Sequence, residues 1–210
     1  MTMQYGVDVA SVRLDDLDKR VLAAVEQMVG AGVSPCVLDV GCGQGGLSGA
    51  LAAAGATVTA IDIDDYGDVL HGQSMSHGDA IDFIHADIRD WVTTNTERFN
   101  LVVLQRVLHY LPYEDARIAL EKLHVVSDRF YLSVTGAETA IANHYEVLKE
   151  PITERWGKLD KVGQELFSIS APLCLYTEGE VRELLEKTGW KTDWLRVSDF
   201  GNIKVEAKRN

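Results

Sequence analysis

Two features that mark membrane and secreted proteins are missing from the sequence. No apolar run in the 210 residues reaches the roughly 18 residues that suggest a membrane-spanning helix. Residues 1–8 have neither the basic region nor the apolar core of a secretory signal. We therefore expect a cytoplasmic protein without membrane-spanning helices.

Cysteine and clustered positive charge are also scarce. Three cysteines are present, Cys36, Cys42 and Cys174, and no pair has the Cys-x-x-Cys spacing of a metal site. We expect reduced thiols and no metal centre. The formal net charge is −12, and no Lys/Arg cluster is longer than the pair Lys208–Arg209. Because this charge repels long polyanions, nucleic-acid substrates are disfavoured, and a small or cationic substrate fits better.

Alternating apolar segments predict an α/β fold. Apolar residues recur at helical spacing from Leu14 to Val29, which predicts an amphipathic helix. Five later segments are predicted as strands: Cys36–Val40, Thr57–Ile61, Ile81–Ala86, Phe99–Leu104 and Arg129–Val134. Helices are expected at Leu47–Ala54 and from Pro112 onward. Strands that alternate with helices favour a parallel sheet covered on both faces.

The C-terminal part departs from this alternation. Thr177 and Glu180 have the spacing of a capping box before a helix that ends at Gly189. Two strand-like segments follow, Trp190–Val197 and Asn202–Ala207, and the four residues between them are too few for a crossover helix. We expect a Rossmann-like three-layer sandwich whose mostly parallel seven-stranded sheet includes a C-terminal antiparallel strand.

We expect residues 1–210 to form one domain with two additions. Residues 1–35 would form an N-terminal helical cap. Residues 136–176 form an insertion of the kind that often covers a site, although a packed surface subdomain is the alternative. Residues 64–80 contain three glycines and few apolar side chains, so any helix there should be short or mobile.

A glycine-rich turn follows the first predicted strand. Its pattern, Gly41-x-Gly43-x-x-Gly46, fits the dinucleotide-binding fingerprint, and Asp62 follows about 20 residues later. Such a turn lets the backbone approach a ligand, and the next helix presents free N–H groups. Taken alone, the pattern fits a nicotinamide dinucleotide as well as S-adenosylmethionine.

Three features favour S-adenosylmethionine. Asp39 lies two residues before the first glycine, where a carboxylate would repel a pyrophosphate and attract an ammonium or sulfonium group. Asp87 ends the third strand, where it could accept a hydrogen bond from an adenine amine while Ile88 flanks the ring. The terminal antiparallel strand is a feature that the dehydrogenase fold does not require.

These segments resemble the motifs of class I S-adenosylmethionine-dependent methyltransferases, in the same order. The first motif corresponds to Val37–Gly45, the second to Ala60–Asp62, the third to Ala86–Ile88 and the fourth to Phe99–Gln105. Asn100 stands in the fourth motif where aspartate is more usual. We expect this departure from the family pattern to have little effect, because position 100 precedes the strand. The resemblance extends from the first motif to the end of the chain.

The resemblance implies a role for each candidate cofactor residue. Asp39 and the loop would hold the methionine end, Asp62 both ribose hydroxyls, and Asp87 the adenine amine. The candidate cofactor-binding residues are Asp39, Gly41, Gly43, Gln44, Gly45, Asp62, Ile63, Asp87, Ile88 and Gln105. Ile63 and Ile88 would sandwich adenine, and Gln105 would face the transferring methyl group. For each aspartate, the alternative is a solvated turn or a helix cap.

The acceptor side is less specified. A dedicated base is optional because positioning alone accelerates displacement at an activated sulfonium. His109 is the candidate general base, but packing in the turn before Pro112 is the alternative that we favour. Tyr5, Tyr145 and Trp156 are candidates for the acceptor pocket.

The segment after the fourth strand lacks both the Asn/Asp-Pro-Pro-Tyr/Phe motif of amino-directed DNA methyltransferases and the Pro-Cys nucleophile of cytosine C5 enzymes. The sequence thus predicts a methyltransferase with a small-molecule acceptor. A protein or RNA methyltransferase and a non-catalytic S-adenosylmethionine-binding regulator are the alternatives, and a nicotinamide oxidoreductase is the least favoured.

Overall fold

The structure is a computed structural model that describes Gln4, Tyr5 and residues 15–210. Leu14, at the start of the predicted N-terminal helix, lies outside the described residues, as do most of residues 1–8. No helix within residues 15–210 combines the length and the apolar character that a membrane crossing requires.

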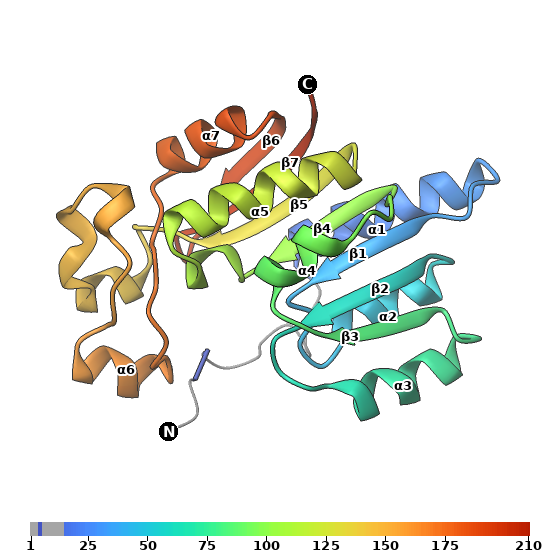
Figure 1. The fold of residues 1–210 in the computed structure, drawn as a ribbon, viewed down its shortest axis with the longest axis horizontal. Coiled ribbons are helices and arrows are strands. Elements are labelled where there is room, and N and C mark those ends of the chain that lie inside the picture. The colour runs from blue at the N-terminus through green and yellow to red at the C-terminus, as the bar shows by residue number, and fades with distance from the viewer. Residues whose placement is uncertain (1–3, 6–14) are drawn as a thin grey trace.

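A seven-stranded sheet forms the centre of the described chain, with strand order β3-β2-β1-β4-β5-β7-β6 (Figure 1). The strands are β1 (Cys36–Val40), β2 (Thr57–Asp62), β3 (Ile81–His85), β4 (Leu101–Gln105), β5 (Arg129–Thr135), β6 (Trp190–Val197) and β7 (Asn202–Arg209). Strands β1 to β5 pair in parallel, and β7 runs antiparallel to both β5 and β6. The predicted mostly parallel sheet with a C-terminal antiparallel strand is confirmed.

Helices cover both faces of this sheet. The α-helices are α1 (Asp16–Gly30), α2 (Gly46–Ala53), α3 (Gly67–Ser76), α4 (Ile88–Thr94), α5 (Tyr113–Val126), α6 (Lys161–Phe167) and α7 (Glu178–Lys187). Apolar side chains of α1, α2 and α3 form a core on one face, and those of α4, α5 and α7 form a core on the other. Strand β4 is buried between the two cores, as its continuous apolar sequence predicts. The three-layer sandwich is confirmed.

The strand bounds lie within two residues of those predicted, and β4 shows why they shift. Phe99 forms only an isolated bridge to Ser127, and the strand begins at Leu101. Asn100 precedes the strand: its N–H donates to the Cys36 carbonyl at 2.8 Å, and its Oδ1 accepts from the Cys36 N–H at 2.7 Å. The amide oxygen thus makes the contact that an aspartate oxygen could make there.

Helix α4 was not predicted. Asp87 caps its N-terminus by accepting a hydrogen bond from the Arg89 N–H at 2.9 Å. Ile88 and Val92 are buried at helical spacing. Seven residues supply too little periodicity for a prediction from sequence, so the N-cap aspartate was the available signal.

Residues 136–176 are ordered around a small apolar core of their own that includes Tyr145, Leu159 and Leu173. The segment contains α6 and three 3₁₀ turns: η2 (Ala140–His144), η3 (Glu146–Lys149) and η4 (Ile152–Glu154). It contacts the turn that follows β4, where the Cys174 N–H donates to the His109 carbonyl at 2.7 Å. Tyr5 bridges to Ile169, and the Gln4 carbonyl accepts from the Ser170 N–H at 2.9 Å, so these two residues lie beside the insertion.

Helix α3 occupies the stretch where the sequence predicted only a short helix, and it contains Gly72. A Cβ at Gly72 would meet no atom within 4 Å, so the Gly72→Ala variant should stabilise the protein by about 0.5–1 kcal/mol through helix propensity. Urea denaturation measures this change. A variant less stable than the wild type would mean that α3 does not form in solution.

Candidate functional site

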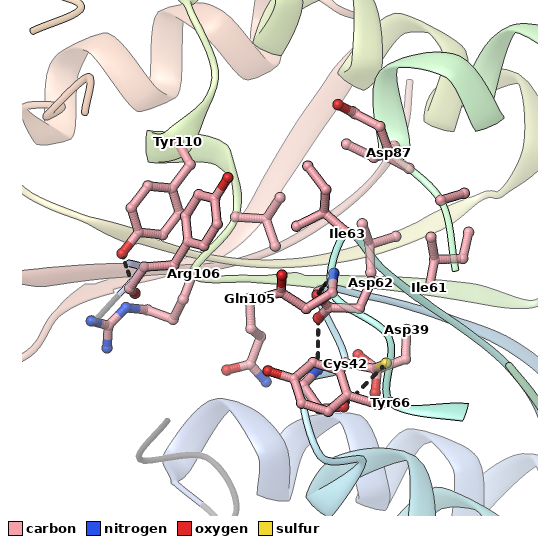
Figure 2. Close-up of a pocket in the computed structure, with 18 of the residues that line it drawn as sticks. Asp39, Cys42, Ile61, Asp62, Ile63, Tyr66, Asp87, Gln105, Arg106 and Tyr110 are labelled. Carbon is pink, nitrogen blue, oxygen red and sulfur yellow. Dashed lines mark hydrogen bonds between the residues drawn. The ribbon is translucent and has the colours of Figure 1, made fainter. Parts of the chain in front are cut away.

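A cavity of about 470 Å³ opens at the carboxyl ends of β1, β2, β3 and β4 (Figure 2). Ligands of open α/β sheets bind at this edge, and the volume lies in the usual range for small-molecule sites. Eight of the predicted cofactor residues line it together: Asp39, Gly41, Gly43, Asp62, Ile63, Asp87, Ile88 and Gln105. Gln44 and Gly45 belong to the same turn but do not line the cavity.

The glycine-rich turn is held tightly in place. Gly41 and Cys42 both donate backbone hydrogen bonds to the Ile61 carbonyl, at 2.8 and 3.1 Å. Gly41 has a φ of +74°, and a Cβ there would lie 2.0 Å from a methyl carbon of Val107. Only glycine therefore fits at position 41, and its backbone remains open to the cavity.

Asp39 places a buried carboxyl at the base of the cavity. It is 3% exposed, and its Oδ2 accepts a hydrogen bond from the Ser48 hydroxyl at 2.6 Å. Burial raises the pKa of Asp39 to about 6, and the nearby carboxylates of Asp18 and Asp62 act in the same direction. A cation placed in the cavity would stabilise the ionised form.

Asp62 connects the end of β2 to the glycine-rich turn. Its Oδ2 accepts from the Gly43 N–H at 2.8 Å, and its Oδ1 accepts from the Asp64 N–H at 3.0 Å. Burial raises its pKa. Each carboxylate oxygen can accept a further hydrogen bond, so both remain available to a pair of hydroxyls.

Asp87 combines cavity lining with the helix-cap role that was its alternative. Its Oδ2 accepts from Arg89 Nη2 at 2.5 Å, and this guanidinium lowers the pKa of Asp87. Arg89 also contacts Asp115 at 3.4 Å. A contact between Asp87 and an adenine amine stays a prediction, and Asp87 would have to share its oxygens with Arg89.

The chain matches known methyltransferases in sequence. Residues 37–129 match the family described as a methyltransferase domain. The chain is 40% identical over 81 residues to the ubiquinone biosynthesis O-methyltransferase of Actinobacillus pleuropneumoniae, covering 36% of this chain and 35% of that protein. It is 41% identical over 102 residues to an uncharacterised methyltransferase of Mycobacterium bovis, covering 48% and 49%. The aligned part thus spans about a third to a half of these relatives.

Solved structures share the fold along nearly the whole chain. One is the 1,6-didemethyltoxoflavin-N1-methyltransferase of Burkholderia thailandensis, crystallised with 1,6-didemethyltoxoflavin and S-adenosylhomocysteine. It is 19% identical to this chain with a TM-score of 0.68, and the alignment covers 97% of this chain and 81% of that protein. The magnesium protoporphyrin IX methyltransferase of Synechocystis PCC 6803, bound to S-adenosylhomocysteine, has 23% identity and a TM-score of 0.64, with coverages of 94% and 89%. Residues 37–129 thus match a methyltransferase domain, and the chain shares the fold of these solved methyltransferases.

Several cavity residues were missed by sequence reasoning. Asp18, in the first turn of α1, accepts a hydrogen bond from Gln105 Nε2 at 2.5 Å. It also belongs to the capping box of α1, which is the role its spacing from Asp15 indicates. Burial raises the pKa of Asp18. Gln105 is the last residue of β4, and the bond to Asp18 holds its amide at the cavity wall.

Aromatic side chains line another side of the cavity. The rings of Tyr5 and Tyr110 pack edge to face with centroids 5.0 Å apart, and the Tyr110 hydroxyl donates to the Tyr5 carbonyl at 2.5 Å. Of the three aromatic candidates for the acceptor pocket, Tyr5 lines the cavity, whereas Tyr145 and Trp156 do not. Ser168, from the 136–176 insertion, lines it as well.

His109 does not line the cavity. It is 1% exposed, and its ring nitrogens lie 3.4 and 3.3 Å from the N–H and the hydroxyl of Thr135. Burial and the nearby Arg106 charge lower its pKa well below the usual value, so the ring is neutral at pH 7. This environment favours the packing role over the general base.

Proposed function

We propose that the protein transfers a methyl group from S-adenosylmethionine to a small-molecule acceptor bound in the same cavity. The proposal rests on one observation: two different sets of residues line this cavity. Its lining includes the predicted cofactor residues, and also a wall of Tyr5, Tyr110 and Leu111 that this cofactor set does not use. A cytoplasmic location, expected from the sequence, is part of the same proposal.

The lining suits a cofactor with an ammonium and a sulfonium group. Five aspartates but only two arginines are among the described residues that line the cavity. The aspartates are Asp18, Asp39, Asp62, Asp64 and Asp87, and the arginines are Arg89 and Arg106. One of the arginines, Arg89, is already paired with carboxylates. A pyrophosphate would be repelled at this site, whereas a cation would be attracted.

The residue roles follow the positions in the cavity. Asp39 and the backbone at Gly41 and Gly43 would hold the methionine end. Asp62 would accept hydrogen bonds from the ribose hydroxyls. Ile63 is 44% exposed although it is large and apolar, and a flat ring between it and Ile88 would cover it. Asp87 would bind the exocyclic amine of that ring.

When bound, the cofactor supplies an activated methyl group for in-line displacement. The contribution of the protein is to align the two reactants and to exclude water, which in favourable cases is worth roughly 7–11 kcal/mol. Asp18 would hold Gln105 toward the reacting end of the cavity. We assign no general base, because His109 is buried behind the lining and bonded to Thr135.

Two parts outside the motifs would complete the site. We propose that residues 1–35 act as a helical cap, because Tyr5 and Asp18 line the cavity. We also propose that residues 136–176 cover the acceptor end, because Ser168 lines the cavity and Tyr5 bridges to Ile169. Both additions would belong to one domain with the sheet.

The proposal is tested by a transfer assay with methyl-labelled S-adenosylmethionine. The acceptors are a metabolite library, a protein extract and total RNA, and Asp62→Ala is the control with a damaged cofactor site. We expect label in a small molecule with the wild type and none with the control. Label only in protein or RNA would contradict the proposal, and cofactor binding with no transfer at all would favour a regulator.

Asp39 should make stability depend on pH. The pKa of Asp39 is about 6 in the folded protein and about 3.8 in an unfolded chain. At a pH between these two values, the folded state therefore keeps a proton that the unfolded state has released. Stability should therefore fall as pH rises from about 4 to 6, by up to about 3 kcal/mol from this group. Asp39→Asn should remove that part of the slope in urea denaturation at a series of pH values.

The same titration should appear in cofactor binding. A bound cation favours ionised Asp39, so the affinity for S-adenosylmethionine should rise between pH 5 and 7 in the wild type. The Asp39→Asn variant should bind more weakly, with a flatter profile. Equal pH profiles for the two proteins would place the cationic groups of the cofactor away from Asp39.

A further inference from the structure

Arg106 is the cavity-lining cation whose side chain has no hydrogen-bond or ion-pair partner among the residues that the structure describes. The other lining arginine, Arg89, is held by Asp87 and Asp115. Arg106 itself is exposed, so its guanidinium meets water where a ligand would lie. A guanidinium with free donors in a small-molecule site is available to an anion.

The backbone fixes where Arg106 lies. The residue directly follows β4 and has a φ of +59°, a left-handed conformation that is uncommon for side chains other than glycine, asparagine and aspartate. Its N–H donates to the Ser133 carbonyl at 2.8 Å, and the following residue, Val107, packs against Gly41. Residues with backbone strain of this kind cluster at active sites and ligand-binding sites.

Arg106 lies on the aromatic side of the cavity. Figure 2 shows it beside Tyr110, with Asp39, Asp62 and Asp87 on the opposite side and Gln105 between. Its charge lowers the pKa of His109 and opposes the burial that raises the pKa of Tyr110, which agrees with its position beside Tyr110. The cationic position is thus separate from the carboxylates proposed for the cofactor.

We infer that Arg106 binds an anionic group, a carboxylate or a phosphate, on an acceptor whose apolar or planar body lies against Tyr110. The inference rests on the proposed function and names the chemical class of its acceptor. A net charge of −12 repels an anion over most of the protein surface, so a local cation is needed to admit one. The planar guanidinium fork matches carboxylate and phosphate oxygens in pairs. The net charge had favoured a small or cationic substrate, and the local arrangement at Arg106 specifies an anion instead.

The test measures binding of matched ligand pairs at pH 7.5 with saturating S-adenosylhomocysteine. The pairs are benzoate and benzamide, 1-naphthoate and 1-naphthamide, indole-3-acetate and indole-3-acetamide, and phenyl phosphate and phenol. The wild type should bind the anionic member of at least one pair about tenfold or more tightly than its neutral partner, the scale of one charge-assisted contact. The phenyl phosphate arm separates a phosphate acceptor from a carboxylate acceptor.

Three variants assign the preference. Arg106→Gln should abolish it, and Arg106→Lys should retain part of it because the charge stays while the paired donors are lost. Arg98→Gln removes the same charge from an exposed position outside the cavity lining and should leave the preference intact. The affinity for S-adenosylhomocysteine should stay unchanged in all three variants.

The outcomes separate the two claims. Failure of the wild type to bind S-adenosylhomocysteine would overturn the proposed function. If S-adenosylhomocysteine binds but no anionic ligand binds more tightly than its neutral partner, the inference about Arg106 is overturned alone. A preference that survives in Arg106→Gln overturns it equally.

Discussion

Replacing Asp62 by alanine should weaken S-adenosylhomocysteine binding about a hundredfold. The proposed ribose contact consists of two hydrogen bonds to a charged group, each worth about 1.5–3 kcal/mol, and a loss of about 3 kcal/mol corresponds to two orders of magnitude in Kd. Isothermal titration calorimetry of the two proteins measures the change. A Kd within threefold of the wild-type value would contradict the assignment of Asp62 to the ribose.

The stability of the ligand-free protein should change little in the same variant. Asp62→Ala removes the bonds from Gly43 and Asp64, but it also removes a carboxylate whose burial raises its pKa. These effects oppose each other, so the free energy of unfolding should stay within about 1 kcal/mol of the wild type. Asp62→Asn is the matched control, because it keeps an acceptor for Gly43 and should lose less affinity. A large loss of stability would make Asp62 a structural residue.

Replacing Gly41 by alanine should damage both folding and cofactor binding. An alanine at a φ of +74° costs about 1–2 kcal/mol, and the overlap with Val107 adds about 1–3 kcal/mol. We therefore expect about 3 kcal/mol less stability in urea denaturation and no measurable S-adenosylhomocysteine binding. Binding is lost because relief of the overlap displaces Gly41 or Val107, both of which line the cavity.

Two further variants distinguish the strain at position 41 from the general effect of replacing a glycine by alanine. Gly72→Ala should show the opposite sign, because its Cβ meets open space. Adding Val107→Ala to Gly41→Ala removes the overlap and leaves the backbone strain, so cofactor binding should recover in part. If Gly41→Ala alone were as stable as the wild type and bound the cofactor normally, the turn would not have the conformation described.

The sequence predicted the elements whose signals are local. Buried parallel strands are continuous apolar runs, and β1 to β5 lie close to their predicted bounds for that reason. The aspartates at the ends of β1, β2 and β3 could be placed at one edge because parallel strands end on the same side of a sheet. Their arrangement around one cavity followed from topology, without any knowledge of side-chain contacts.

The contacts that escaped prediction join distant parts of the chain. Asp18 meets Gln105 across 87 positions, and Tyr5 meets Tyr110 across 105. In the structure Asp18 belongs to the capping box of α1, a local role that gives no indication of its contact with Gln105. The sequence could place Arg106 near the site, because it follows the fourth strand, but its backbone conformation and its lack of a partner among the described residues are visible only in the structure.

The central claim is that the cavity at the carboxyl ends of β1 to β4 binds an S-adenosyl cofactor rather than a dinucleotide. Calorimetric titration of the wild type with S-adenosylhomocysteine and, separately, with NAD tests it most directly, because the glycine pattern alone fits both ligands. We predict saturable binding of S-adenosylhomocysteine at one site per chain and no heat from NAD. Binding of NAD without binding of S-adenosylhomocysteine would contradict the account.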